Sequence, residues 1–346
     1  MTVTIKDVAA LAGVSAKTVS RVMNGEQHVR AQVRETVMRV VAELAYRPNA
    51  YARSLSSARS YLIALFFDDP ASGYATAMQR GALTRCRERH YHLLVQPLDL
   101  STPDWIEELA ETALSLRLDG AILTPPLSQD VALLAHLAAL NIPFVCISPD
   151  DHARGQAGSV EIDEERAAFD MTSRLIALGH RDIGFIEGHS AHASSGKRRG
   201  GFVSAMTAAG LAIVDAHMIG GDFSFRSGME GGEALLATSP RPTAIFASND
   251  DMALGVSVAA LKHGVAVPSD LAIAGFDDAP TARLAWPPIT TVRQPVSEMG
   301  AAAVDILVEP GYRGNMTAAG YRRRLDYDLI ERDSTGRATP RPIEGT

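Results

Sequence analysis

The sequence has few cysteines and no long apolar run, and these two absences narrow the classes of protein that it can encode. Cys86 and Cys146 are its two cysteines in 346 residues, too few for a disulfide framework or for the ligands of a zinc finger. No segment approaches the roughly 18 apolar residues of a membrane helix. The opening MTVTIKDVAA lacks the basic start and apolar core of a signal peptide. We therefore expect a cytoplasmic protein with reduced thiols.

The motifs of common catalytic sites are also missing. The sequence has no Gly-x-Ser-x-Gly elbow, no P-loop and no Gly-x-Gly-x-x-Gly at a strand–helix junction. His180, His189 and His192 lack the spacing of a helical metal pair. Adjacent acids such as Asp277 and Asp278 would point to opposite sides of a strand, which argues against a paired acid/base site. We therefore predict no enzymatic activity, no metal site and no cofactor.

Charge is divided unevenly along the chain. The formal net charge of −7 argues against nucleic-acid binding when the chain is taken whole. Residues 1–60, however, carry 9 basic and 4 acidic residues, a charge of +5, which leaves −12 for the remainder. A small basic segment therefore precedes a large acidic one. The composition, 46% hydrophobic and 21% charged, is that of a globular protein, and the length predicts two or three domains.

The basic segment predicts three short helices. Thr4 and Asp7 are a possible capping pair for the first, which Gly13 ends. Ser15 is a natural N-cap for the second, AKTVSRVMN, which ends at 24–25 (Asn-Gly). The apolar residues of the third recur at helical spacing: Val33, Val37, Val40, Val41 and Leu44. Two short helices joined by a turn that contains glycine form a helix-turn-helix.

A helix-turn-helix places its second helix in the major groove of DNA. Lys17 and Arg21 can donate hydrogen bonds to guanine, and Ala16 can pack on a thymine methyl group. Small hydroxyl side chains on the same helix can bond phosphates. The competing interpretation is a protein-binding helical bundle whose basic side chains are solvated.

Residues 49–60, NAYARSLSSARS, form a linker that is too short to be a stable helix alone. Leu55 is the only large aliphatic residue between positions 50 and 60. It is a candidate to insert between base pairs from the minor groove. Packing of Leu55 against its own domain is the alternative that the linker alone does not exclude.

After Tyr61, strand-like apolar runs alternate with helical stretches, in two series. The first has strands in YLIALFF, HLLVQPL, GAILTPP, PFVCIS and GSVEI, and helices at 75–90, 104–117 and 129–140. The second has strands in DIGFIEG, AHMIGGD, AIFASND and LAIAGFDD, and helices at 164–178, 197–209, 226–237 and 251–263. Such alternation predicts two α/β lobes with doubly wound parallel sheets, whose ligands bind at the carboxyl ends of the strands.

Polar residues in the second series follow predicted strands. Arg198, Asn249 and Asp277 could converge on one cleft and supply the donors and acceptors that sugar hydroxyls need. Phe223 could stack on the apolar face of a sugar. Asn249 and Asp277 could equally be helix caps or turn residues.

The sequence resembles the lactose-repressor (LacI/GalR) family of bacterial transcription factors. The resemblance rests on IKDVAALAGVSAKTVSRVMN and ELAYRPNAYARSL near the start, and on ALGHRDIGFIEG, RRGGF, PTAIFASNDDMALG, VPSDLAIAGFDDAP and PPITTVRQP in the body. It implies an N-terminal all-α helix-turn-helix domain (1–48), a hinge (49–60) and a two-lobed, periplasmic-binding-protein-like body. The lobes would be 61–160 with 293–322, and 161–292 with 323–332, followed by a frayed tail (333–346). The crossovers between the lobes would lie near 160–163, 290–294 and 321–325.

The resemblance further implies a homodimer on a near-palindromic operator, with paired hinge helices in the minor groove. The residues that it assigns to DNA are Thr4, Ser15, Ala16, Lys17, Thr18, Ser20, Arg21, Asn24, His28, Asn49, Ala52 and Leu55. Arg30 departs from the pattern, because the family often has a capping Ser or Thr there. The residues after Asp333 contain no leucine heptads, so the sequence does not indicate a tetramer.

The same resemblance assigns an effector site between the lobes. Its residues are Ser72, Tyr74, Ser148, Ser194, Arg198, Phe223, Asn249 and Asp277. Positions 72–74 and Ser148 differ from the usual pattern, which leaves the identity of the ligand open. We expect a carbohydrate effector that releases the DNA. A purine or other small metabolite is the alternative effector, and a cytoplasmic sugar sensor that does not bind DNA is the alternative function.

Overall fold

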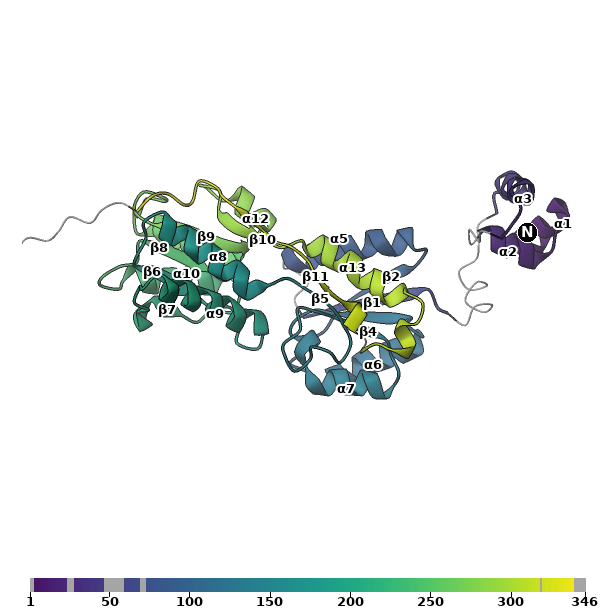
Figure 1. Cartoon of the computed structure of the whole chain (residues 1–346), viewed down its shortest axis with the longest axis horizontal. Coiled ribbons are helices and arrows are strands. Elements are labelled where there is room, and N and C mark those ends of the chain that lie inside the picture. Colours follow the sequence, from purple (N-terminus) through teal and green to yellow (C-terminus); the bar gives the residue numbers. More distant parts are fainter. Residues whose placement is uncertain (1–2, 24–27, 47–58, 69–72, 318, 339–346) are drawn as a thin grey trace, which may run out of the picture. The chain divides into compact units, whose positions relative to one another are not determined.

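The computed structural model describes residues 3–23, 28–46, 59–68, 73–317 and 319–338. The chain divides between Tyr61 and Leu62 into two compact units (Figure 1). The predicted fold class, a helical N-terminal unit followed by a two-lobed α/β body, is confirmed.

The described residues of the N-terminal unit form three helices, α1 (Ile5–Ala12), α2 (Ala16–Met23) and α3 (Ala31–Glu43). Their valines form a small core: Val8, Val19, Val22, Val37 and Val40. The predicted caps are present, since the Asp7 carboxylate accepts hydrogen bonds from the Thr4 nitrogen (2.8 Å) and hydroxyl (2.7 Å), and Ser15 Oγ accepts one from the Thr18 nitrogen (3.1 Å). Arg30 is the N-cap residue of α3, and its side chain forms no capping hydrogen bond, as expected for an arginine.

The first lobe contains a parallel six-stranded sheet. Its strands, in the order β11-β5-β4-β3-β1-β2, are β1 (Leu62–Phe67), β2 (His92–Pro97), β3 (Gly120–Leu123), β4 (Phe144–Ile147), β5 (Gly158–Glu161) and β11 (Arg322–Arg324). Its helices are α5 (Gly73–Glu88), α6 (Trp105–Ser115), α7 (Val131–Ala139), α13 (Val296–Val308) and the short η1 (Leu127–Gln129), η3 (Tyr312–Gly314) and η4 (Ala319–Tyr321). Helix α13 packs against α5 so closely that a Cβ at Gly81 would lie 1.7 Å from the Ser297 carbonyl oxygen.

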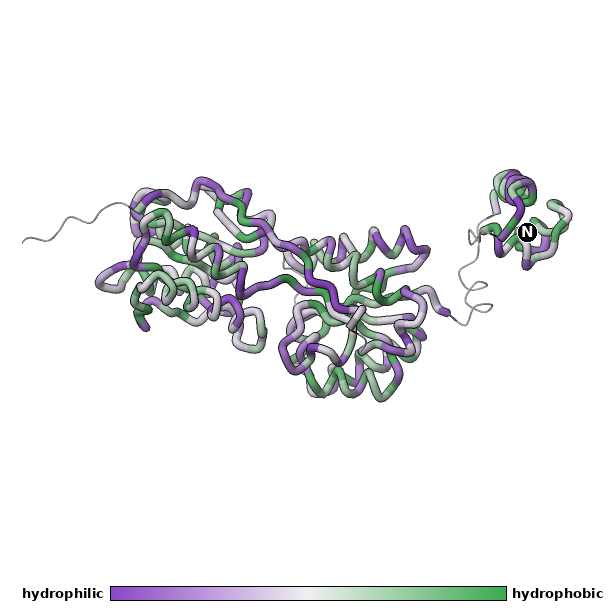
Figure 2. The backbone as a smooth tube through the Cα atoms, in the orientation of Figure 1, coloured by the Kyte–Doolittle hydropathy of each residue, from purple (hydrophilic) through white to green (hydrophobic). Residues whose placement is uncertain are grey.

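The second lobe repeats this architecture. Its strands, in the order β12-β10-β9-β8-β6-β7, are β6 (Ile183–Ile186), β7 (Met218–Ile219), β8 (Ala244–Ala247), β9 (Ala272–Asp277), β10 (Thr290–Arg293) and the antiparallel β12 (Asp328–Ile330). Its helices are α8 (Glu164–Ala177), α9 (Ala193–Ala208), α10 (Phe225–Leu236), α11 (Asp250–Lys262), α12 (Pro280–Leu284) and the short η2 (Asp215–His217). The central strands are buried on both faces, so they are continuous apolar runs (Figure 2).

The order of the strands locates the ligand-binding edge of each sheet. In the first lobe β1 lies between β2 and β3, and in the second lobe β6 lies between β7 and β8. The winding direction of a doubly wound sheet reverses at this position, which opens a crevice at the carboxyl ends of the strands. Loops that follow β1, β3, β6 and β8 therefore carry the residues that can meet a ligand.

The structure corrects three sequence assignments. Strand β11 (Arg322–Arg324) pairs with β5 of the first sheet, although positions 323 and 324 were assigned to the second lobe. Helix α9 begins at Ala193 rather than near position 197, because its Gly- and Ser-rich start has no apolar periodicity. Residues 333–338 are not a frayed tail, since the Ser334 hydroxyl donates to the Ile273 carbonyl (2.6 Å) and the Ala338 nitrogen to the Leu178 carbonyl (3.0 Å).

Candidate functional site

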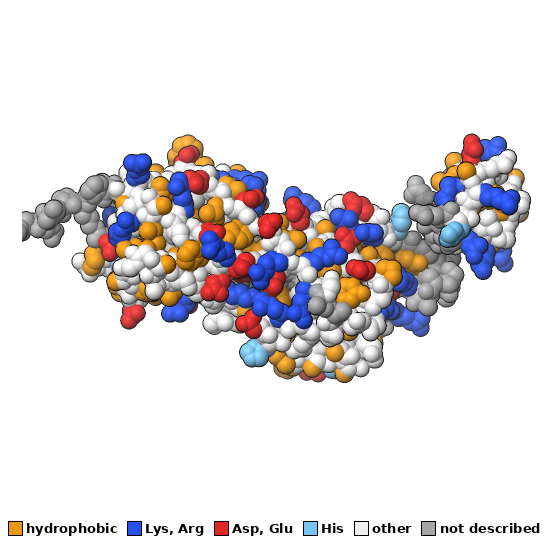
Figure 3. Space-filling model, in the orientation of Figure 1, with side chains coloured by type: hydrophobic (Ala, Val, Ile, Leu, Met, Phe, Trp, Pro, Cys, Tyr) orange, Lys and Arg blue, Asp and Glu red, His pale blue; other side chains and the backbone are white. Residues whose placement is uncertain are grey.

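Helix α2 of the N-terminal unit presents a polar face. It buries Val19 and Val22 in the core, which leaves Lys17 and Arg21 exposed on the other side. The remaining described candidates are also accessible, either exposed or half-buried: Thr4, Ser15, Ala16, Thr18, Ser20 and His28. Basic side chains are prominent on the face of this unit that Figure 3 displays. Asn24, Asn49, Ala52, Leu55 and Ser72 lie outside the described residues.

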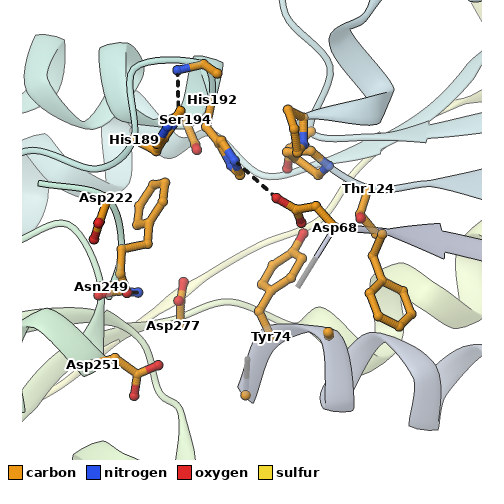
Figure 4. A pocket seen from close by; sticks show the side chains of 18 of the residues that line it. Asp68, Tyr74, Thr124, His189, His192, Ser194, Asp222, Asn249, Asp251 and Asp277 are labelled. Atoms are coloured by element: carbon orange, nitrogen blue, oxygen red, sulfur yellow. Dashed lines mark hydrogen bonds and ion pairs between the residues drawn. The ribbon is translucent and has the colours of Figure 1, made fainter. Parts of the chain in front are cut away.

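A cavity of about 900 Å³ lies between the two lobes of the body. This volume is within the range of small-molecule sites. The cavity is lined from the carboxyl ends of the strands of both sheets (Figure 4). It brings together all the described effector candidates: Tyr74, Ser148, Ser194, Arg198, Phe223, Asn249 and Asp277.

Arg198, on α9, is held by groups of the protein itself. Its Nε lies 3.2 Å from Glu164 Oε2, and its Nη1 donates to the Ser248 carbonyl and lies 3.8 Å from Asp277 Oδ1. The guanidinium stacks on the Phe276 ring, with Cζ 3.8 Å from the ring centroid. Carboxylate, carbonyl and ring fix the orientation of the guanidinium, so it is preorganised at the cavity wall.

The adjacent acids Asp277 and Asp278 have opposite environments. Asp277 lines the cavity with φ +112°, and Gln294 Nε2 donates to its carboxylate (2.6 Å). Burial raises the pKa of Asp277 to about 6 against the opposing effect of Arg198. Asp278 does not line the cavity, and three arginines surround it: Arg283, Arg293 and Arg332. Burial alone would raise the pKa of Asp278. Hydrogen bonds from Arg332 and Arg293 outweigh this effect and hold the pKa below its ordinary value.

Asn249 is a helix cap that also lines the cavity. Its Oδ1 accepts a hydrogen bond from the Met252 nitrogen (2.9 Å), which caps α11, and its Nδ2 donates to the Phe223 carbonyl (2.8 Å). Phe223 has φ +71°, and its ring covers Gly188, where a Cβ would lie 2.1 Å from the ring. Capping and lining are therefore compatible roles for Asn249, because the cap fixes the loop that presents Phe223.

The wall formed by the first lobe carries Tyr74 and Ser148. Tyr74 lies at the start of α5, and burial raises the pKa of its phenol. Ser148 follows β4 with φ +45°, and its hydroxyl lies beside the Tyr74 phenol without the geometry of a hydrogen bond. The Ser148 hydroxyl, which has no hydrogen-bond partner among the described residues, therefore retains bonding capacity.

Sequence reasoning missed several polar residues that line the cavity. They are Asp68, Asp99, Glu164, His189, His192, Asp222, Asp251 and Gln294. A signal existed for Gln294, in the motif TTVRQP. Asp250, the polar residue next to Asn249 after the apolar run AIFA, also lines the cavity. Glu164 carried no such signal, because an acid in the first turn of a helix is ordinarily a solvated residue that favours the helix dipole.

Among the described residues, three polar contacts join the lobes beside the cavity. Gln129 Oε1, in the first lobe, accepts a hydrogen bond from the Ala193 nitrogen (2.9 Å) at the start of α9. Lys197 Nζ, also on α9, donates to the Pro149 carbonyl (2.9 Å). His192 Nε2 lies 3.9 Å from Asp68 Oδ2 (Figure 4). Burial lowers the pKa of His192. The start of α9 is thus one part of the second lobe that the first lobe contacts.

The described residues contain no group of three or more His, Cys, Asp or Glu side chains that could hold a metal ion. None of the described helices is both long enough and apolar enough to cross a membrane.

Comparisons with known proteins agree with this architecture. Residues 4–49 match the family "Bacterial regulatory proteins, lacI family", and residues 172–335 match a periplasmic binding protein-like domain. Catabolite control protein A of Priestia megaterium is 35% identical over 338 residues, which are 97% of this chain and 100% of that protein. The lac repressor dimer bound to operator and the anti-inducer ONPF has a TM-score of 0.78 at 29% identity, covering 97% of this chain and 100% of that one. The complex of the transcriptional regulator CelR with cellobiose has a TM-score of 0.73 at 31% identity, covering 96% and 99%.

Proposed function

Because this chain belongs to the lacI family of bacterial regulatory proteins, we propose that it is a transcriptional repressor whose affinity for operator DNA is set by a small molecule in the interlobe cavity. The observation that carries the proposal is the convergence of seven candidate residues, scattered from Tyr74 to Asp277, on one cavity. A helix-turn-helix precedes this body in the same chain. A DNA-reading unit and a ligand cavity are the two parts that a ligand-responsive repressor requires.

Helix α2 is the proposed reading element in the major groove. Lys17 and Arg21 are exposed on it and can donate to guanine or to phosphate, while Ala16 is small enough to meet a thymine methyl group. The hydroxyl residues of the face would position the helix on the backbone. The hinge roles of Ala52 and Leu55 are proposed on the sequence alone.

The repressor acts as a homodimer in this proposal, because one unit reads one half of a near-palindromic operator. Leu284, the last residue of α12, and Trp286 are the proposed core of the contact between the two bodies, because they are the most exposed of the large apolar side chains in the described part of the chain. The protein performs no catalysis in this proposal, and its site of action is the nucleoid in the bacterial cytoplasm.

The proposed effector is a sugar or sugar derivative. Phe223 offers an aromatic face, and Arg198, Asn249 and Asp277 surround it with polar groups. The chain passes between the two sheets three times, at residues 162–163, 294–295 and 325–327. A ligand that binds one arrangement of the lobes more tightly would shift the operator affinity by the same coupling free energy.

Binding to DNA from the region upstream of its own gene, measured by gel shift at several salt concentrations, tests the proposal. We expect a specific shift, with an affinity that falls steeply as salt increases. Lys17→Ala should weaken specific binding about tenfold or more, and Leu55→Ala should also weaken it. Arg39→Ala, which removes an exposed basic residue from α3, is the matched control. No specific shift, or one that is indifferent to both test variants, would refute DNA regulation.

A further inference from the structure

The cavity has an unusual balance of charge. Its described lining residues include seven carboxylates: Asp68, Asp99, Glu164, Asp222, Asp250, Asp251 and Asp277. The same lining includes one arginine, Arg198, two histidines and no lysine. The guanidinium of Arg198 is already committed to Glu164, and Asp277 lies 3.8 Å from it. Among these lining residues, the carboxylates therefore outnumber the cationic side chains.

Several of the acids retain their negative charge. Hydrogen bonds from Ser224 and Ser227 lower the pKa of Asp222, and hydrogen bonds from Ser101 lower that of Asp99. Asp250 is different, because it is fully buried and accepts hydrogen bonds from the Thr291 hydroxyl (2.6 Å) and the Ala279 nitrogen (2.7 Å). Burial raises the pKa of Asp250 well above its ordinary value. Even with Asp250 protonated and Glu164 neutralised by Arg198, the cavity remains negative.

The carboxylates of the cavity supply many hydrogen-bond acceptors, beside donors such as Tyr74 and Arg198. Gln294 is 4% exposed, its Nε2 is used by Asp277, and its Oε1 has no hydrogen-bond partner among the described residues. Carboxylate oxygens of Asp222, Asp251 and Asp277 can only accept while ionised. Hydroxyl and ammonium groups of a ligand would satisfy these acceptors. A phosphate or carboxylate group would bring further acceptors and a like charge.

Building on the proposed function, we infer that the effector carries no acidic group: the cavity selects an uncharged or cationic, hydroxyl-bearing ligand and excludes phosphorylated sugars and sugar acids. The ring of Phe223 stacks on the carbon face of such a ligand, and the carboxylates receive its hydroxyl protons. A protonated amine on the ligand strengthens binding, because it enters a negative field.

The potential of the cavity can be measured without a known effector. Ala191 lines the cavity and is exposed, so an Ala191→Cys variant of the full chain places a thiol at its mouth. Ser204→Cys, exposed on α9 outside the cavity lining, is the control. Cys86 and Cys146 are buried, and burial raises the pKa of both thiols to about 12, so they do not compete. The probes are two methanethiosulfonates, one carrying a trimethylammonium group and one a sulfonate.

At each position we compare the rate of modification by the cationic probe with the rate by the anionic probe. We expect the ratio of these two rates to be at least about tenfold higher at position 191 than at position 204, which is the size of effect that one nearby charge produces. Adding Asp222→Asn and Asp251→Asn to the Ala191→Cys variant should lower that ratio. Equal ratios at the two positions, or a ratio that favours the sulfonate at 191, would overturn the inference.

A thermal-shift screen of the full chain then tests selection by ligand class. It compares matched neutral sugars, amino sugars, uronic acids and sugar phosphates on one ring. Stabilisation by a uronic acid or a sugar phosphate greater than by its neutral parent would overturn the inference, even with DNA binding intact. Failure of operator binding, by contrast, would refute the proposed function and leave the charge measurement standing.

Discussion

Gln129 Oε1 lies 2.9 Å from the backbone nitrogen of Ala193, so a side chain of the first lobe caps a helix of the second. The first amides of a helix have no partner within it, and His192, the N-cap residue of α9, provides no side-chain bond. Helix α9 also carries Ser194 and Arg198. The same helix therefore contacts the first lobe and lines the cavity. Separation of the lobes would remove the cap and expose the amide.

Gln129→Ala should therefore loosen the start of α9 without unfolding the chain. We expect faster amide hydrogen exchange in the peptide that contains Ala193, because its nitrogen loses its acceptor. Gln96→Ala is the matched control, since the Gln96 amide bonds Glu108 within the first lobe. Unchanged exchange at Ala193 in the Gln129 variant would show that the cap has no role in holding the lobes together.

The Arg198–Glu164 pair predicts a loss of stability. Both side chains are almost fully buried, with exposed fractions of 6% and 2%, so removing the charge of Glu164 leaves a buried guanidinium with less compensation. Glu164→Gln should lower the free energy of unfolding by about 2 kcal/mol in urea titrations. Glu165→Gln, at the exposed neighbouring position, should change it by less than about 0.5 kcal/mol. Equal effects of the two variants would contradict the assigned role of the pair.

Much of the body could be predicted from periodicity. The central strands are continuous apolar runs, and the amphipathic stretches between them are helices, so the predicted doubly wound lobes follow from local sequence. Strand β12 was missed because it is a three-residue edge strand, too short to show a period. Ser334 was assigned to a frayed tail because its burial depends on β9 and β10, which a local pattern does not reveal.

The candidate site was predictable where topology alone brings residues together. Asn249 and Asp277 each end a strand or follow one, and parallel strands end at a common edge. Glu164 was not predictable in this way, because it begins a helix, where an acid is ordinary. Asp68 follows β1 and had the same topological signal as Asn249. Its contact with His192 of the other lobe (3.9 Å) depends on how the lobes pack, which no spacing in the sequence encodes.

The adjacent acids Asp277 and Asp278 should have opposite effects on stability. The folded-state pKa of Asp277, about 6, exceeds the ordinary value of 3.8, so its ionisation costs stability above pH 6 and this cost disappears as the pH falls toward 4. Asp277→Asn should therefore raise the free energy of unfolding at pH 7.5 by about 3 kcal/mol, and the gain should vanish near pH 4. Urea titrations across this pH range measure the difference.

Asp278→Asn is the matched control, because three arginines stabilise the ionised form of Asp278. Its loss should destabilise the protein at pH 7.5 by about 3 kcal/mol. The same sign of effect for both variants at this pH would contradict the different environments assigned to the two carboxyls.

His180 should make the second lobe sensitive to mild acid. Its Nε2 donates to the Gly336 carbonyl (3.1 Å), its Nδ1 lies 2.9 Å from the Thr243 hydroxyl, and burial lowers its pKa from 6.5. The unfolded chain binds the proton more tightly, so stability is full above pH 6.5 and is lost as the pH falls below it. His180→Gln should flatten the pH dependence of the melting temperature between pH 7 and 5, whereas His263→Gln, at an exposed position, should leave it unchanged. An unaltered slope in His180→Gln would show that this histidine is not the sensor.

Leu284 and Trp286 test the proposed dimer. Their exposed fractions are 84% and 91% within one chain, and burying two such side chains against a partner gains free energy in proportion to the apolar area covered. Leu284→Glu and Trp286→Glu should each raise the dimer dissociation constant by about tenfold or more, because the introduced carboxylate would lose its water in the interface. Sedimentation equilibrium measures the constant directly. Leu114→Glu, at a half-exposed site on α6 of the first lobe, is the control and should sediment as the unaltered chain does. If both variants remain dimeric at the same concentrations, the subunits associate through another face. Weaker operator binding by these variants could then not be ascribed to loss of the paired reading helices.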